Sequence, residues 1–206
     1  MSSPSRSEHL RASPPLFASP TLDRLTRVHH LVPVAIFAPV LLVLGVLAFR
    51  AQGLGALAWI ALGYLCWTLT EYWMHRTVFH FEPEHPIGKR LHFLIHGVHH
   101  EHPNDPRRLV MPPSASLPLA ALFAGAFLLA AGTPRFFGLF AGFVLGYLVY
   151  DELHYVLHHA TPRGRLGRWL RELHMRHHFQ DDSRGFGISA PYWDRVFGTL
   201  PGRREP

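Results

Sequence analysis

The sequence predicts an all-α integral membrane protein, a four-helix transmembrane bundle with a histidine-rich helical cap on its cytoplasmic side. Three observations indicate this fold: stretches almost free of charge, basic residues concentrated in alternate loops, and 17 histidines that mostly follow the apolar stretches. The single cysteine, Cys66, excludes an internal disulfide framework and any cysteine-based zinc module. Any metal site must therefore use nitrogen and oxygen ligands.

The first three helices are expected where charge is absent over 20 or more residues. These stretches are residues 28–49, 51–70 and 109–134. A bilayer core about 30 Å thick needs about 20 helical residues to cross it. Buried helices of a soluble protein are the alternative, but long segments rich in Leu, Ala, Phe and Gly are more typical of lipid-embedded helices. We therefore expect membrane helices at about 30–49, 54–76 and 114–131.

The fourth helix is expected at about 136–158. Residues 136–150 carry no charge, and Asp151 and Glu152 then interrupt a run that stays apolar through Leu157. The last turns of this helix are predicted to leave the membrane or to line a polar site, because two adjacent acids are costly inside hydrocarbon.

The basic residues support this topology. Successive segments outside the apolar stretches carry four, one, five, one and nine Lys or Arg residues. This alternation is the positive-inside pattern for four spans with both termini in the cytoplasm. It also explains the net charge of +6 without nucleic-acid binding, because the basic loops face anionic lipid.

The chain is expected to divide into two parts. Residues 1–27, rich in Ser and Pro, are predicted to be a flexible tail, since they lack the apolar core of a signal peptide. Residues 28–206 form the membrane-embedded domain, whose cytoplasmic cap comprises 77–113 and 159–200. The use of arginine with almost no lysine is typical of a GC-rich genome and favours a bacterial inner membrane.

Ten histidines form four clusters on the side of the basic loops. They are His75 and His80; His96, His99 and His100; His154 and His158; and His174, His177 and His178. Helical residues four apart lie about 40° from each other and residues three apart about 60° the other way. Each cluster except the first therefore shares one helix face. His75 and His80 lie about 140° apart on an ideal helix, which predicts that the helix ends or distorts there.

These clusters predict a binuclear metal site. Imidazole suits iron, zinc, copper and nickel. Ten nitrogens are too many for one ion and suit two, with five ligands each and a position left for a small molecule. Such neutral ligands differ from the carboxylate-rich di-iron sites of soluble four-helix bundles.

Other polar residues near the clusters are candidates to support the ligands. His92 and His159 adjoin ligand clusters and are expected to hydrogen-bond to ligand imidazoles. Asp151 precedes His154 by one turn, and Glu71 precedes His75 by four residues. Each of these acids is expected either to orient an imidazole or to face water, and Asp151 is favoured because it interrupts an apolar helix.

The motifs around the histidines resemble those of the fatty acid 2-hydroxylases, in the membrane fatty acid hydroxylase and sterol desaturase superfamily. The matching motifs are EYWMHRTVFH (71–80), LHFLIHGVHH (91–100), RLVMPP (108–113), YLVYDELHYVLHH (147–159), HMRHHF (174–179), GFGIS (185–189) and WDRVFGT (193–199). The resemblance covers residues 71 to 200. It is specific, because the order and spacing of all four clusters match together.

The resemblance implies a histidine-rich di-iron monooxygenase that uses O2 to place one oxygen atom on carbon 2 of a long acyl chain, in a fatty acid or a ceramide. It assigns the metal ligands to His75, His80, His96, His99, His100, His154, His158, His174, His177 and His178. Zinc can replace iron in purified protein through the Irving–Williams order. The N-terminal tail is too short for the cytochrome b5 domain of many relatives, which implies a separate cytochrome b5-like or ferredoxin-like electron donor with its reductase.

A site at the cytoplasmic helix ends suits this chemistry, because the acyl tail can stay in hydrocarbon while a carbon near the headgroup reacts. Aromatic residues near the clusters are candidates for the substrate access route, although interfacial anchoring is a common use of such residues. They are Tyr72, Trp73, Phe93, Tyr150 and Tyr155.

Three alternatives stay open. A related enzyme that acts on a sterol, an alkane or a carotenoid would show the same clusters. A metal transporter would need histidines along a path through the helices, whereas no histidine falls in the middle of an expected span. A catalytically silent scaffold would have no need for intact clusters.

Overall fold

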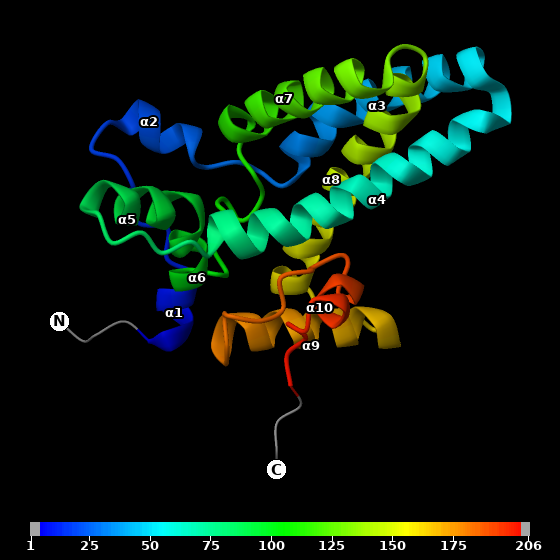
Figure 1. Ribbon diagram of the computed structural model, residues 1–206. Helices are drawn as coiled ribbons and strands as arrows, with labels where there is room; N and C mark the ends of the chain where they lie inside the picture. Colours follow the sequence, from blue (N-terminus) through cyan, green and yellow to red (C-terminus); the bar gives the residue numbers. More distant parts are fainter. Residues whose placement is uncertain (1–4, 203–206) are drawn as a thin grey trace.

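The computed structural model describes residues 5–202, and all the regular elements in that range are helical (Figure 1). The elements are α1 (Arg6–Leu10), α2 (Pro20–Leu25), α3 (Leu31–Gln52), η1 (Gly53–Gly55), α4 (Ala56–Met74), η2 (His75–Phe79), α5 (Pro86–His92), η3 (Phe93–Gly97), α6 (Val98–Glu101), α7 (Pro113–Ala131), α8 (Arg135–His159), α9 (Arg165–Phe179) and α10 (Tyr192–Val196). The segment η1 is a 3₁₀-helix, and η2 and η3 are π-helices.

The long apolar helices lie where the sequence predicts them and form two hairpins. Helices α3 and α4 are joined through η1, and α7 and α8 through a short turn (Figure 1). At each turn a glycine, Gly53 or Gly132, has a positive φ of 55° or 63°, which costs little only without a side chain. Both turns lie at the end of the bundle away from the chain termini (Figure 1).

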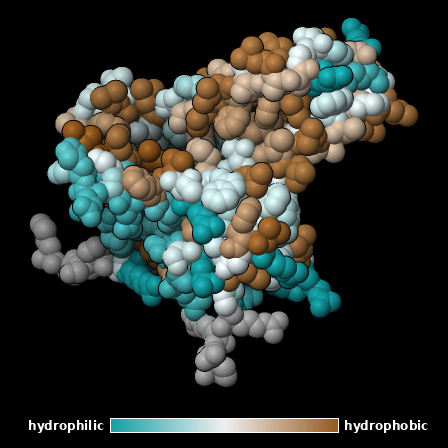
Figure 2. All heavy atoms as spheres, in the orientation of Figure 1, coloured by the Kyte–Doolittle hydropathy of each residue, from teal (hydrophilic) through white to brown (hydrophobic). Residues whose placement is uncertain are grey.

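The outer surface of the hairpins is apolar. Leu54 is 80% exposed and Leu129 is 89% exposed, and hydrophobic residues are widespread along the hairpins, with some hydrophilic residues at their tips (Figure 2). Three continuous helical stretches are long and apolar enough to cross a membrane: Leu31–Phe79, Pro113–Ala131 and Arg135–His159. The first of these contains the α3–α4 hairpin. A surface this apolar is stable in lipid and not in water, so the chain is a membrane protein.

Helix α8 is the centre of the bundle, because it packs against α3, α4 and α7 and is the most buried of the long helices. Gly142 faces α4 so closely that a Cβ atom would lie 1.9 Å from the carbonyl oxygen of Ile60. Gly63 on α4 has the same relation to the carbonyl oxygen of Leu139. The two backbones are therefore in direct contact, as at membrane interfaces built from small residues.

The flexible tail predicted for residues 1–27 is wrong for residues 5–27, and residues 1–4 lie outside the described part. Residues 5–27 contain α1 and α2, whose N-caps are Ser5 and Ser19. The buried Asp23 carboxylate accepts hydrogen bonds from the backbone N–H of Leu16, at 2.7 Å, and from the Arg108 guanidinium, at 3.0 Å. The Ser/Pro-rich composition does not reveal this order, because the charge that fixes the segment lies 85 residues away.

The cap lies at the end of the bundle that carries the termini. Helices α5, α6, α9 and α10 occupy this end (Figure 1), where hydrophilic residues are concentrated (Figure 2). The cap therefore meets the last turns of α4 and α8, where their histidines lie.

Candidate metal centre

The structure brings the ten predicted histidines together in two groups of five. Within each group, one nitrogen of every ring lies within 4.8 Å of the others. The first group is His75, His80, His96, His100 and His177, and the second group is His99, His154, His158, His174 and His178. The predicted division into five and five is thus present in the geometry.

The π-helix η2 brings His75 and His80 onto one face. In a π-helix the hydrogen bonds join residues five apart, and the His80 N–H donates to the His75 carbonyl over 3.2 Å. The two Nε2 atoms lie 3.2 Å apart. The distortion expected from the 140° separation is therefore this widened turn.

Adjacent histidines diverge and place the two groups side by side. His99 belongs to the second group and His100 to the first, and His177 and His178 divide in the same way. Neighbouring helical residues point about 100° apart. Each pair therefore contributes one histidine to each group. From the sequence, the histidines of each of these clusters are instead expected to point in one direction.

The nitrogen spacing in the first group fits a shared cation. The Nε2 atoms of His75 and His96 lie 3.2 Å apart, and those of His96 and His100 lie 3.0 Å apart. Two imidazole nitrogens held at right angles about 2.1 Å from one ion would be about 3.0 Å apart. The rings thus converge as ligands of one ion do.

Backbone carbonyls fix two rings of the first group. His75 Nδ1 donates to the carbonyl of Phe186 over 2.8 Å, and His177 Nδ1 donates to the carbonyl of Arg184 over 2.7 Å. A carbonyl can only accept, so the proton of each neutral ring lies on Nδ1. The Nε2 lone pairs then point into the group, which is the arrangement that metal-binding histidines use.

The second group contains buried nitrogens with no partner. Among residues 5–202, the Nε2 atoms of His99 and His154 and both ring nitrogens of His178 are buried and form no hydrogen bond. Burial, followed by the neighbouring His174, lowers the pKa of His178 well below its usual range. A neutral imidazole with an unsatisfied buried nitrogen is costly, and a bound cation removes this cost for the one nitrogen that it binds.

The carboxylates of Glu71 and Asp151 hold the protein together, and among residues 5–202 neither forms a hydrogen bond with a ligand histidine. Glu71 accepts hydrogen bonds from the backbone N–H of Ser189, at 2.7 Å, and from its hydroxyl. Asp151 accepts from the Met111 N–H and from the Tyr147 hydroxyl, both at 3.2 Å. The orienting role expected for Asp151 is therefore wrong, because its two oxygens are directed at the loop before α7 and at its own helix.

The other two support candidates also lie apart from the ligand rings. His159 is exposed and packs on the Tyr155 ring, with centroids 4.4 Å apart. His92 is half-buried at the end of α5. In the described part of the chain, neither donates a hydrogen bond to a ligand histidine.

Sequence reasoning missed the residues that fix the segment 185–199. Asp194 accepts hydrogen bonds from the backbone N–H groups of Phe186, at 2.9 Å, and Gly187, at 2.8 Å, and from the Thr199 hydroxyl at 2.8 Å. With the Glu71–Ser189 contact, these bonds hold the Phe186 carbonyl against His75. In the sequence, these residues are indicated only by their position within the motifs at 185–189 and 193–199.

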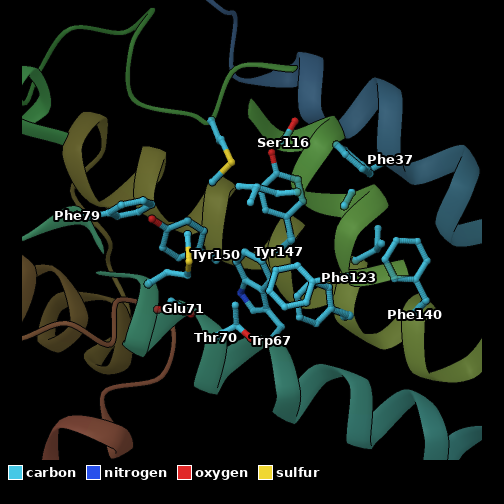
Figure 3. A pocket seen from close by; sticks show the side chains of 16 residues that line it. Phe37, Trp67, Thr70, Glu71, Phe79, Ser116, Phe123, Phe140, Tyr147 and Tyr150 are labelled. Carbon is cyan, nitrogen blue, oxygen red and sulfur yellow. The ribbon is translucent and has the colours of Figure 1, made fainter. Parts of the chain in front are cut away.

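A cavity of about 380 Å³ adjoins both groups. His96 of the first group and His99 and His154 of the second lie in its wall. A narrower apolar cavity of about 50 Å³ adjoins it between α3, α4, α7 and α8 (Figure 3). The residues shared by both linings are Met74, Phe79, Met111, Leu119 and Tyr150. The site therefore opens toward the apolar interior of the bundle.

Of the five aromatic residues predicted along the access route, the structure places Tyr150 in these linings. Tyr72 instead hydrogen-bonds to the Thr199 hydroxyl over 2.9 Å, and Trp73 packs on Phe197. These two residues lie on the face of α4 that meets the C-terminal segment, outside the two cavities described above. Their role along the access route stays a prediction.

The other two aromatic residues are also outside the cavities in the described structure. Tyr155 stacks on His30, with ring centroids 4.1 Å apart, and Phe93 begins η3 beside Gly97. Their role along the access route stays a prediction, and closeness in sequence to a histidine does not fix the direction of a side chain.

The fold and the site together define a helical membrane protein with two histidine groups suited to metal ions. The sequence model of the fatty acid hydroxylase family matches residues 60–199. The chain belongs to this family.

Curated relatives and a solved structure agree. The dihydroceramide fatty acyl 2-hydroxylase FAH1 of Arabidopsis thaliana is 43% identical over 150 residues, 71% of this chain and 62% of that protein. The ceramide very long chain fatty acid hydroxylase SCS7 of Saccharomyces cerevisiae is 39% identical over 202 residues, 95% of this chain and 52% of that protein. The solved structure of full-length scs7p, with only its hydroxylase domain visible, matches with a TM-score of 0.85 and 36% identity over 90% of this chain and 71% of that chain. The chain thus spans about half to three fifths of the length of these curated relatives.

Proposed function

We propose that this protein is a membrane di-iron monooxygenase that places one oxygen atom from O2 on carbon 2 of a long acyl chain. The substrate is a fatty acid or the N-acyl chain of a ceramide. One observation carries the proposal: histidines of both groups stand in the wall of a cavity that adjoins an apolar space between lipid-facing helices. The names of the relatives support carbon 2 as the position of attack.

We assign the ten histidines as the ligands of two iron ions, five for each ion. When bound, iron supplies with O2 the redox chemistry that amino-acid side chains lack for breaking an inert C–H bond. The chain keeps its ligand nitrogens neutral by burial, and it directs the Nε2 atoms of His75 and His177 inward through the carbonyls that hold their Nδ1 protons. Zinc is expected to occupy the same nitrogens in purified protein.

The cavities position the substrate. The narrow cavity, lined by residues such as Trp67, Phe123 and Phe143, takes the end of the acyl tail and excludes water. The larger cavity carries polar side chains, among them Thr26, Arg108 and Asp151, beside the histidines. When the substrate carbonyl is held there, the adjacent carbon of the acyl chain faces the histidine groups. The position of attack then follows from how the acyl chain fits the two cavities.

The topology proposed for the chain has four membrane spans, both termini in the cytoplasm and a bacterial inner membrane as its compartment. Alternation of basic residues supports the orientation, and both ends of the described chain lie at the same end of the bundle as the cap (Figure 1). The electron donor is a separate cytochrome b5-like or ferredoxin-like protein with its reductase.

The test is product analysis with isotopic oxygen. Iron-loaded protein in lipid, given a reductant, ceramide and ¹⁸O2, is expected to yield 2-hydroxy acyl product containing one ¹⁸O atom by mass spectrometry. His85→Ala should behave as the wild type, because His85 is an exposed N-cap outside both groups. An unlabelled acyl pool would refute the proposal, and an ¹⁸O-labelled sterol, alkane or carotenoid in its place would assign the alternative substrate class.

A further inference from the structure

Helix α9 carries metal-site histidines on one face and arginines on the other. His174 and His177 are buried, whereas Arg165 and Arg168 are exposed. Arg171 is half-buried and lies between this exposed face and the histidine face, three residues from both Arg168 and His174. An α-helix with its side chains is about 10–12 Å across, so one helix separates the arginine face from both histidine groups.

The arginine face has an excess of positive charge. Between residues 163 and 176 there are five arginines and one acid, Glu172, and Glu172 is paired with Arg176. In the part of the chain that the structure describes, the guanidinium groups of Arg163, Arg165, Arg168 and Arg171 form no ion pair. The face therefore has charge available for a partner.

A groove in this face provides a place for contact. It has a volume of about 560 Å³, and Arg168, Arg171, Met175 and Phe179 are among the residues that line it. Apolar side chains between charged ones are typical of transient protein interfaces, which combine steering charge with a small desolvated centre.

The groove faces water. Helix α9 lies at the opposite end of the molecule from α3 and α7 (Figure 1), and hydrophilic residues dominate this end (Figure 2). The bilayer surrounds the apolar hairpins, so a partner of α9 comes from the aqueous phase.

The proposed reaction requires such a partner. Hydroxylation of a C–H bond converts R–H, O2, two electrons and two protons to R–OH and H2O. The C–H and O–O bonds break, one oxygen atom is retained in the product, and the second leaves as water. An external reductant must supply the two electrons, because two electrons from thiols require a pair of thiols and the described part of the chain has one, Cys66.

Resting on the proposed function, we propose that the arginine face of α9 is the docking site of a small acidic protein that carries one electron at a time. Two successive dockings deliver the two electrons. Acidic carriers are steered to this face by the unpaired arginines, and α9 places the carrier one helix away from both histidine groups. The affinity is then set mainly by charge and falls with ionic strength.

The first experiment measures binding without catalysis. Zinc-loaded protein in neutral-lipid nanodiscs is titrated with two probes, a plant-type [2Fe–2S] ferredoxin and the soluble domain of cytochrome b5. Arg165→Glu/Arg168→Glu should weaken binding of the cognate probe about tenfold or more at low salt, and Arg165→Lys/Arg168→Lys should preserve it. Arg107→Glu, an exposed arginine elsewhere on the cap, is the matched control and should bind as the wild type. Zinc content per chain, unchanged in all variants, verifies that the site is folded.

The second experiment compares reductants. The double glutamate variant should lose turnover driven by the protein carrier and keep turnover driven by dithionite. Equal binding of the double glutamate variant and the wild type, or an equal loss in Arg107→Glu, would overturn the docking site. Product with dithionite in that case leaves the proposed function standing, whereas absence of 2-hydroxylated product with every reductant overturns the proposed function itself.

Discussion

The two histidine groups have the same number of rings but are held in different ways. In the first group, backbone carbonyls of the segment 184–186 hold the protonated nitrogens of His75 and His177. In the second group, the Nδ1 atoms of His158 and His174 have no partner among residues 5–202, and neither does either nitrogen of His178. The protein chain orients the first group, whereas the second depends more on the ion that it binds.

This difference has an energetic meaning. A ring that donates to a carbonyl already has the right tautomer and orientation before an ion arrives. Little conformational entropy is therefore lost when the ion binds. A buried nitrogen without a partner costs about 1–3 kcal/mol, and an ion offsets that cost only for the one nitrogen of each ring that it binds. In the second group the buried Nε2 atoms of His99 and His154 have no other partner among residues 5–202, so occupation of this group is expected to contribute more to stability.

The largest expected effect is the loss of a ligand from either group. His99→Ala in the second group and His177→Ala in the first should each lower the metal content from two ions per chain toward one. Each should also reduce 2-hydroxy product at least about 100-fold, since the proposed chemistry needs both ions. Metal analysis and mass spectrometry measure these two quantities. Full activity of both variants would refute the ligand assignment.

Chelation of the bound ions should affect the stability around the two groups differently. Removal of the ions should lower Tm by about 10 °C or more, because each kcal/mol shifts the Tm of a chain of this size by about 2–4 °C. Hydrogen exchange should increase more at the end of α8 and in α9 than in η2 and η3. An equal increase in both regions would contradict the distinction between the groups.

Asp194→Asn should weaken the first group selectively. The neutral amide holds the N–H groups of Phe186 and Gly187 less firmly, so the Phe186 carbonyl orients His75 less well. Metal affinity at the first group is expected to fall about 10–100-fold, with the second group unchanged, as measured by competition with a chelator. Ser183→Ala, a change at an exposed serine, is the control.

The smallest effect concerns pH and the ion-free protein. Burial lowers the pKa of His99, His174 and His178 of the second group well below the usual 6.5. For the half-buried His100 of the first group, burial and the neighbouring His177 lower the pKa to about 2. The unfolded chain therefore binds protons below pH 6.5 that the folded chain does not, and the free energy of unfolding decreases as the pH falls.

Urea unfolding of ion-free protein measures this effect. The free energy of unfolding should be at least about 1 kcal/mol lower at pH 5.5 than at pH 7.5, because one pKa unit corresponds to about 1.4 kcal/mol per group. Protein loaded with ions should show a larger decrease, since protons also displace the metal. A pH-independent free energy of unfolding would contradict the buried, neutral state of these rings.

The sequence is sufficient to predict the long helices and to select the ten clustered histidines. Charge-free length reveals α3, α4, α7 and α8, because the bilayer sets the number of residues needed to cross it. Helical spacing reveals the histidine faces, and the separation of His75 and His80 predicts the distortion at η2. These features depend on residues that are close in the chain.

The rest depends on residues that are far apart in the chain. Glu71 and Ser189 are 118 residues apart, and Asp23 and Arg108 are 85 residues apart. A local sequence pattern cannot predict such contacts. Only the fold shows the roles of Glu71 and Asp194 and the ordered structure of residues 5–27. The same holds for the side-chain directions of Tyr72 and Tyr155.

The π-helix η2 sets an upper limit on the number of residues between its two histidines. If one residue were inserted between His75 and His80, six residues would separate them, and neither an ordinary helix nor a π-helix would place both rings on one face. Insertions should therefore be tolerated in the loop around Pro83 but eliminated by selection from 75–80. Among natural variants of this protein, inserted residues should occur after His80 and not between His75 and His80.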